Sequence, residues 1–204
     1  MPSATSDTAR PPAAGDAGPA LLPVKVVVAG GFGVGKTTLV GTVSEIAPLR
    51  TEAAMTALSV GVDDTSQVSG KTTTTVALDF GRARLNDRLV LYIFGTPGQD
   101  RFWFMWDDLV EGAVGAIVLV DTRRLADSFG PLEYFEKKGS PFVVAVNEFA
   151  GAHDYSDEEL REALGLGADV PLLRGDVRDR ASAKAMLVEL AQHALRRRRA
   201  VPAP

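Results

Sequence analysis

The chain has 204 residues, of which 46% are apolar and 24% charged, which excludes a wholly disordered or fibrous chain and is typical of a globular protein. The absence of cysteine excludes disulfides, thiolate metal sites and a cysteine nucleophile. A formal net charge of −4 argues against nucleic acid as a partner bound through overall charge.

The first residues are predicted to form a disordered leader. Thirteen of the first 23 residues are Ala, Gly or Pro, and such a segment buries too little apolar surface to offset the entropy lost on ordering. We therefore assign residues 1–22 to a leader, residues 23–200 to one folded domain and residues 201–204 to a tail. The leader lacks the basic start and apolar core of a secretory signal. No apolar stretch approaches the ~20 residues of a membrane span, so the sequence predicts a cytoplasmic protein.

Strand and helix patterns alternate from residue 24 onward. Asn86 and Asp87 predict a hairpin turn, Ser156 with Glu159 three residues later predicts a capping box, and Pro131 marks the start of a helix or a break in one. Strands are predicted at 24–29, 75–80, 88–94, 113–120, 141–146 and 170–173, and helices at 36–46, 156–164 and 180–197. This alternation predicts a three-layer α/β/α fold, in which a mostly parallel six-stranded sheet gains one antiparallel edge strand from the hairpin.

The segment from Gly30 to Thr37 fits the pattern G-x-x-x-x-G-K-[ST] between a predicted strand and a predicted helix, which is the context of a P-loop. Glycines let successive backbone N–H groups turn toward phosphates, and the helix N-terminus adds a favourable dipole. Lys36 is expected to reach the β- and γ-phosphates, and the Thr37 hydroxyl to bind Mg²⁺. The plainer alternative is a glycine-rich turn with a chance lysine, but the matching context favours a P-loop NTPase. The predicted nucleotide-binding residues here are Gly30, Gly31, Phe32, Gly33, Val34, Gly35, Lys36, Thr37 and Thr38.

Beyond the P-loop, residues 24–198 resemble the small Ras-like GTPases. The segment from Thr75 to Phe80 is similar to their first switch, the segment from Phe94 to Phe102 to their second switch, and the strand ending at Asn147 to the one that ends in their base-recognition motif. The Lys-Thr-Thr-Thr-Thr run and the proline after the threonine at position 96 most resemble a bacterial branch, which includes cell-polarity GTPases and those of actinobacterial conservons. That resemblance implies a Roadblock-family regulator as a partner.

The resemblance also implies roles for individual residues. Thr75, with Thr74 as second choice, would close over Mg²⁺ and the γ-phosphate, Gly98 would offer its N–H to that phosphate, and Gln99 would orient the attacking water. The implied cofactors are GTP or GDP and Mg²⁺, with Thr37 and Thr75 as metal ligands, and Gln99, Lys36 and Thr75 as the catalytic group. Asn147, Asp176 and Val177 would lie at the base.

Three departures from the family pattern leave other functions open. Gly95 replaces the aspartate that holds Mg²⁺ through water, the base motif reads Asn147-Glu148-Phe149-Ala150 without its carboxylate, and the last loop carries Asp176-Val177-Arg178. Loss of a hydrogen-bonding partner for the base weakens selectivity for guanine. The leading hypothesis is a GTP-binding switch that hydrolyses slowly, because no arginine occupies an evident finger position. The alternative is a degenerate nucleotide-binding scaffold, and a third interpretation is a P-loop ATPase or kinase that uses Asp121.

Two surface features predict partners. The run from Phe102 to Trp106 holds four aromatic residues in five positions, and it predicts a docking surface at the second switch that includes Trp103 or Trp106. The plainer alternative is that half of these residues are core and half are shielded by a neighbouring helix. The arginines from Arg196 to Arg199 suit a helix C-terminus, and they would also allow a peripheral contact with an anionic membrane.

Overall fold

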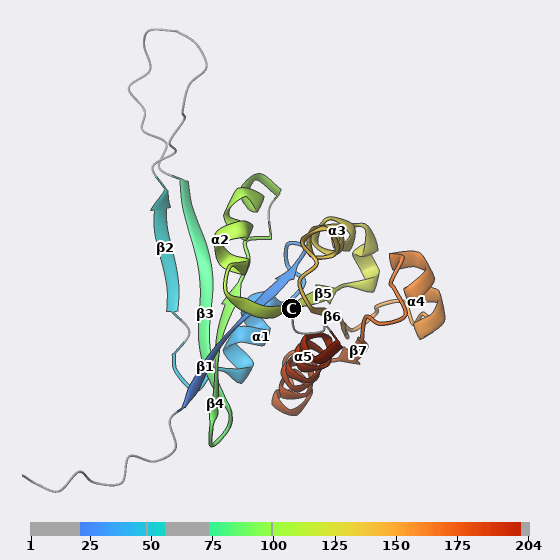
Figure 1. Cartoon of the computed structure of the whole chain (residues 1–204). Helices are drawn as coiled ribbons and strands as arrows, with labels where there is room; N and C mark the ends of the chain where they lie inside the picture. The colour runs from blue at the N-terminus through green and yellow to red at the C-terminus, as the bar shows by residue number, and fades with distance from the viewer. Residues whose placement is uncertain (1–20, 48, 56–73, 99, 201–204) are drawn as a thin grey trace, which may run out of the picture.

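The computed structural model describes residues 21–47, 49–55, 74–98 and 100–200 (Figure 1). The predicted leader therefore lies outside the described residues except for its last two, and the predicted tail lies wholly outside them. The strands are β1 (Leu22–Gly30), β2 (Leu49–Met55), β3 (Thr74–Asn86), β4 (Leu89–Gly95), β5 (Ala113–Val120), β6 (Phe142–Asn147) and β7 (Leu172–Gly175). The helices are α1 (Lys36–Val43), α2 (Trp106–Val110), α3 (Phe129–Lys138), α4 (Asp157–Leu164) and α5 (Arg180–Ala200), with 3-10 turns η1 (Asp100–Met105) and η2 (Thr122–Ser128).

The strands form one sheet in the order β2-β3-β4-β1-β5-β6-β7. Strands β4, β1, β5, β6 and β7 pair in parallel, while β3 runs antiparallel to both of its neighbours. The predicted three-layer α/β class is confirmed. The sheet has one strand more than the prediction, because β2 pairs with β3 over seven residues and moves the antiparallel strand inward from the edge.

The missed strand has a simple explanation in its sequence. Strand β2 reads Leu-Arg-Thr-Glu-Ala-Ala-Met and contains a single β-branched residue, so its intrinsic preference does not indicate a strand. It forms against the long β3, which supplies a complete ladder of backbone partners. Pairing with an existing edge therefore overrides local propensity in this segment.

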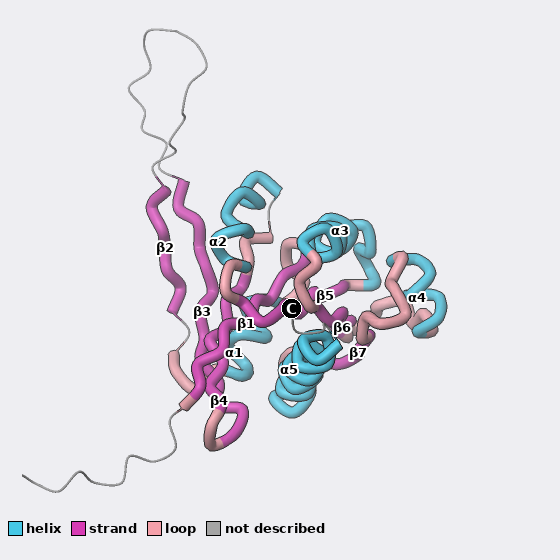
Figure 2. Tube along the Cα trace, in the orientation of Figure 1, coloured by secondary structure: helices cyan, strands magenta, loops and turns pink. Residues whose placement is uncertain are grey.

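Two hydrophobic cores lie on opposite faces of the sheet, and Figure 2 shows the helices gathered beside its central strands. Alternate residues of β1 divide between the cores: Val26 and Val28 face α1 and α5, whereas Val27 faces α2 and α3. This division follows from the two-residue repeat of a strand, and it requires a run that is apolar on both sides. The layers hold the carboxyl ends of β1, β4, β5 and β6 together at one edge of the sheet.

Helix ends agree with the local sequence signals. The Ser156 side chain accepts a hydrogen bond from the Glu159 backbone, and the Glu159 side chain accepts one from the Ser156 backbone, which confirms the predicted capping box. Pro131 lies in the first turn of α3, where its missing N–H costs no helical hydrogen bond. No helix among the described residues is long and apolar enough to cross a bilayer.

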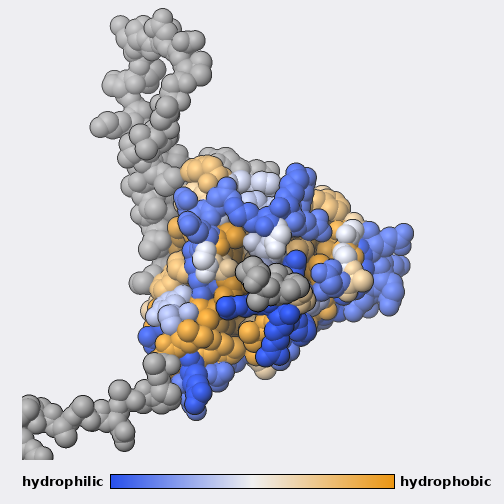
Figure 3. Space-filling view, in the orientation of Figure 1, coloured by the Kyte–Doolittle hydropathy of each residue, from blue (hydrophilic) through white to orange (hydrophobic). Residues whose placement is uncertain are grey.

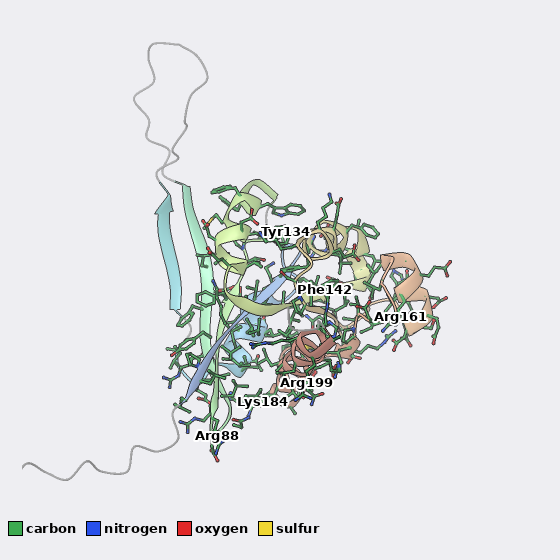
Figure 4. The ribbon with its side chains drawn as sticks, in the orientation of Figure 1. Arg88, Tyr134, Phe142, Arg161, Lys184 and Arg199 are labelled. Carbon is green, nitrogen blue, oxygen red and sulfur yellow. The ribbon has the colours of Figure 1, made fainter. Side chains whose placement is uncertain are left out.

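The aromatic run at the second switch is divided between the core and the surface. Trp106 has no exposed surface and packs against Tyr134 and Phe135 of α3, with ring centroids 5.1 and 6.0 Å away; Figure 4 labels Tyr134 within this layer. Phe102 is also buried, whereas Phe104 is 63% exposed. The prediction of Trp106 as a docking residue was wrong, because its ring fills the core between α2 and α3.

We expect Trp106→Ala to lower the free energy of unfolding by about 3–5 kcal/mol, as is typical when a large buried aromatic side chain is removed. The exposed Phe104→Ala is the matched control, and it should change that energy by less than about 0.5 kcal/mol. Urea unfolding of both variants measures the difference. Similar losses in the two variants would contradict the assignment of Trp106 to the core.

Candidate functional site

The loop between β1 and α1 has the backbone geometry of a phosphate cradle. Gly30 has φ +137°, and a Cβ at that position would lie 2.5 Å from the Leu119 carbonyl oxygen. Gly35, which precedes α1, has φ +110°, and its Cβ would lie 2.7 Å from Nδ2 of Asn147. Side chains at either position would clash and would strain the backbone. The chain can therefore pass this closely to β5 and β6 only with glycine there.

Lys36 is enclosed by its own loop. The residue is buried, and its Nζ donates hydrogen bonds to the carbonyl oxygens of Gly30 at 2.8 Å and Gly31 at 2.7 Å. Burial lowers the pKa of the Lys36 ammonium to about 8, and the negative charge of Asp79 opposes that shift. The loop therefore holds a partly desolvated cation at the bottom of the predicted phosphate site.

A carboxylate that the sequence did not indicate lies beside Thr37, the second residue of α1. The Thr37 hydroxyl donates a hydrogen bond to Oδ2 of Asp79 at 2.5 Å. Asp79 pairs across the sheet with Gly95, and a Cβ at position 95 would lie 3.1 Å from the Asp79 Cβ. Glycine at position 95 thus leaves room for the Asp79 carboxylate, which lies on β3 directly across from the position where the Ras-like pattern has an acid on β4.

The start of the second switch packs directly on the P-loop. A Cβ at Gly98 would lie 2.6 Å from the Lys36 Nζ and 3.0 Å from the Phe32 Cα. Together these segments line a hollow of about 350 Å³, whose walls are Phe32, Gly33, Gly35, Lys36, Thr37, Thr38, Asp79, Thr96, Pro97 and Gly98. The predicted phosphate and switch residues are therefore neighbours in the structure.

Asn147 joins the P-loop to the last loop of the site. Its side chain is buried, its Nδ2 donates to the Val34 carbonyl at 2.9 Å, and its Oδ1 accepts from the Val177 N–H at 3.2 Å. We predicted that the Asn147 side-chain amide and the Val177 N–H would contact the base. In the structure they are hydrogen-bonded to each other. In this structure Asn147 acts as a brace between β6, the P-loop and the loop after β7.

Two acidic side chains near the predicted base region carry arginine partners. Asp176 accepts hydrogen bonds from the Arg178 guanidinium, and this contact lowers the pKa of the Asp176 carboxyl. Asp121 is buried and accepts from the Arg123 side chain at 2.8 and 2.9 Å, which likewise lowers its pKa. Arg123 therefore holds the Asp121 carboxylate in this structure, and the metal role of Asp121 in an ATPase remains a prediction.

A second residue that the sequence did not indicate supports the P-loop from outside. Nη2 of Arg124 donates to the Phe32 carbonyl at 2.7 Å, although the two residues are 92 positions apart. Arg124 also lies 3.7 Å from the carboxylates of Asp121 and Asp127. No local motif reveals this contact, since it depends on the way η2 packs against the loop.

Two predicted catalytic residues have limited structural description. Gln99 lies outside the described residues. Thr75 belongs to β3, where it pairs with Ala54 of β2. Their predicted roles therefore remain predictions.

The fold is that of a G domain. The structure is similar to the cytosolic domain of the FeoB iron transporter of T. maritima in its apo form, with a TM-score of 0.60 and 17% identity over 85% of this chain and 64% of that one. It is also similar to the FeoB G-domain of Methanococcus jannaschii, with a TM-score of 0.57 and 12% identity over 85% of this chain and 98% of that one. The chain thus spans under two thirds of the T. maritima cytosolic domain.

The sequence assigns the chain to a family. Residues 28–197 match the family described as conserved hypothetical ATP binding protein, and the chain belongs to that family. An uncharacterized protein of Methanocaldococcus jannaschii is 31% identical over 127 residues, which cover 61% of this chain and 70% of that protein. Family and fold together define a P-loop nucleotide-binding protein.

We expect Asn147→Ala to destabilise the fold by about 1–3 kcal/mol, because the Val34 carbonyl and the Val177 N–H would lose their common partner in a buried setting. Asn86→Ala is the control, since the Asn86 side chain accepts a hydrogen bond from an exposed turn N–H, that of Arg88. That variant should cost less than about 0.5 kcal/mol. Thermal or urea unfolding compares them, and equal stability of the two variants would contradict the bracing role.

Proposed function

We propose that the protein is a guanine-nucleotide switch that binds GTP and GDP with Mg²⁺ and hydrolyses GTP slowly. The observation that carries the proposal is the cluster of Lys36, Thr37 and Asp79 at the P-loop, with Gly98 packed against it. A cation, a hydroxyl and a carboxylate thereby face one hollow beside the start of a helix, which suits a phosphate chain and its metal ion.

The donor set fits Mg²⁺. This ion prefers oxygen ligands and keeps several waters, so it needs only one or two protein groups together with phosphate oxygens. The Thr37 hydroxyl would bind it directly and Asp79 would hold its water shell, while Thr75 is the further ligand that the Ras-like resemblance implies. Bound there, Mg²⁺ would neutralise phosphate charge that Lys36 and the loop N–H groups also stabilise.

Contact between Gly98 and Lys36 supports a switch. The backbone at Gly98 adjoins the ammonium group that is expected to hold phosphate, so a phosphate bound on that side of Lys36 requires residue 98 to move. Binding would then alter the segment that continues into Gln99, which we propose as the residue that orients water. The chain's own Arg124 bonds the Phe32 carbonyl, so we expect the accelerating arginine to come from a regulator.

A regulator would dock near the second switch. Phe104 is 63% exposed, and Trp103, whose ring packs on Gly130 of α3, is half-buried and lines a neighbouring hollow of about 380 Å³. Exposed aromatic side chains next to a pocket are typical of interface centres. We propose this Phe104–Trp103 surface for a Roadblock-family regulator, the partner implied by the resemblance to bacterial polarity GTPases.

A second candidate function follows from the base region. Ala150 stands where the guanine-binding carboxylate of the Ras-like pattern belongs, and Asp176 is paired with Arg178. These features favour a scaffold that binds nucleotide with relaxed base preference and little hydrolysis. Titration of the purified protein with GTP, GDP, ATP and ADP separates the two functions: guanine-selective binding supports the switch, and equal binding of all four supports the scaffold.

We expect Asp79→Asn to raise the Mg²⁺ concentration needed for tight GTP binding by about 10–100-fold, the usual cost of removing an outer-shell partner of a metal. Binding in EDTA should be unchanged, because Lys36 and the loop amides remain. Fluorescent GTP titrated with Mg²⁺ measures the midpoint. The matched control is Asp87→Asn, in the turn after β3; a midpoint for Asp79→Asn equal to that of the control would remove Asp79 from the metal site.

The lowered pKa of Lys36 predicts a pH dependence of binding. The ammonium form attracts phosphate, and in the free protein it is lost as the pH rises through about 8. Bound phosphate favours the charged form, so GDP affinity should be level below that pH and should fall about tenfold per pH unit above it. Calorimetry in buffers of different ionisation enthalpy should also detect proton uptake on binding above that pH. Affinity that is level throughout, without proton uptake, would contradict this role.

A further inference from the structure

An apolar groove lies at the edge of the sheet opposite the nucleotide site. It has a volume of about 560 Å³ and is formed by the first residues of β1, β4 and β5, the loop before β6, and the last turns of α5. The P-loop begins at Gly30, at the other end of β1. The groove is therefore separated from the proposed phosphate site by the full length of that strand, and a ligand here would be additional to the nucleotide.

Small residues on α5 create the groove. Over its first turns α5 fills the space above the sheet with Met186, Leu187 and Leu190, all fully buried. Immediately after Leu190, the residues of α5 that line the groove include Ala191 and Ala194, whose single methyl groups fill less space than the leucine and methionine side chains before them. Leu22, at the start of β1, is 61% exposed, and Leu195 on the helix is 55% exposed.

The groove combines an apolar lining with a cationic rim. Apart from Arg197 and Arg198, the described residues that line it are glycine, proline or residues with aliphatic side chains. Arg196 pairs with Glu189 at 2.6 Å, whereas among the described residues no acidic side chain lies within salt-bridge distance of Arg197, Arg198 or Arg199. Figure 3 shows an apolar area next to the strongly hydrophilic end of α5, and Figure 4 places Arg199 on that helix and Arg88 at the β3–β4 turn.

From this arrangement we propose that the groove receives the acyl chain of an anionic phospholipid and thereby docks the protein on an anionic membrane surface. Volumes of about 300–1,000 Å³ are typical of small-molecule sites, and the groove lies within that range. The unpaired arginines complement a phosphate headgroup, although the chain as a whole carries a net charge of −4. A second copy of the chain would bring like charges together at this rim, and the lining offers no aromatic ring on which a base could stack.

The membrane surface accounts for both parts of the site. Basic residues alone attract any anionic surface, and apolar side chains alone attract any partner, but their combination at one groove selects an amphiphile whose head is negative. This proposal is independent of the nucleotide site. Variants in the groove should therefore leave nucleotide affinity unchanged, which provides an internal test of folding.

The test is co-flotation of the full chain with vesicles of phosphatidylglycerol and phosphatidylcholine in equal parts, and with vesicles of phosphatidylcholine alone. We expect binding to the anionic vesicles and at least about tenfold weaker binding to the neutral ones. The double variant Arg197→Ser/Arg198→Ser should weaken anionic binding about 20–30-fold. Absence of binding by the parent chain would overturn the proposal.

A filling variant separates acyl insertion from simple attraction of charge. Ala194→Phe keeps the charge and occupies the groove, so it should reduce binding to anionic vesicles by at least about tenfold. Val188→Phe adds the same ring on α5 at a position that is 37% exposed and outside the groove, and it should bind like the parent. If Ala194→Phe also binds like the parent, the groove takes no lipid and the proposal fails.

Two further outcomes would assign the groove to another occupant. A chain that ends at Ala200 and binds vesicles at least tenfold more tightly than the full chain would indicate that residues 201–204 cover the groove. A dimer in sedimentation velocity that Ala194→Phe disrupts would indicate a second copy. Either result would overturn the lipid assignment. Hydrogen exchange that slows at the start of β1 and the end of α5 only with anionic vesicles would support it.

Discussion

The site depends on a positive charge held out of water. Lys36 is the first residue of α1, and the Gly30 and Gly31 carbonyls of the preceding loop accept hydrogen bonds from its ammonium group. Burial of an ammonium group is costly unless such partners are present. The backbone can offer those carbonyls only because β1 ends in glycines that pass close to β5, and because Arg124 fixes the Phe32 carbonyl from outside. Sheet, loop and Arg124 therefore all contact the segment that keeps one cation facing the hollow.

Local signals in the sequence were sufficient for the phosphate loop and insufficient for the groups that complete it. The glycines and Lys36 are adjacent in the chain, so their spacing alone predicts their common role. Asp79 becomes a site residue only through its pairing with Gly95 across β3 and β4, and Arg124 only through the packing of η2. Strand β2 was not predicted, because its partner strand rather than its own sequence stabilises it. The aromatic run did not indicate that Trp106 lies in the core while Phe104 is exposed.

Recognition of the base is the part of the site that departs furthest from the Ras-like pattern. Asn147 is retained, and the structure gives it a role that is independent of the base: it ties the Val34 carbonyl to the Val177 N–H. A residue needed to hold two loops together would be kept whether or not guanine is selected. The presence of Asn147 is consequently weaker support for guanine than its place in the motif implies, and the absence of a carboxylate at Ala150 carries more weight.

The position of Asp79 on β3 has a consequence for communication within the molecule. Thr75 and Asp79 belong to one continuous strand. In the Ras-like pattern, by contrast, the threonine and the acid come from different strands. Covalent continuity means that a sliding or tilting of β3 displaces both residues together. The strand continues to Asn86 at the opposite end of the sheet, with a shift of its register against β4 between Arg84 and Asn86. A partner bound at the β3–β4 hairpin would thus displace the residues of the proposed Mg²⁺ site through the backbone itself, over the whole height of the sheet.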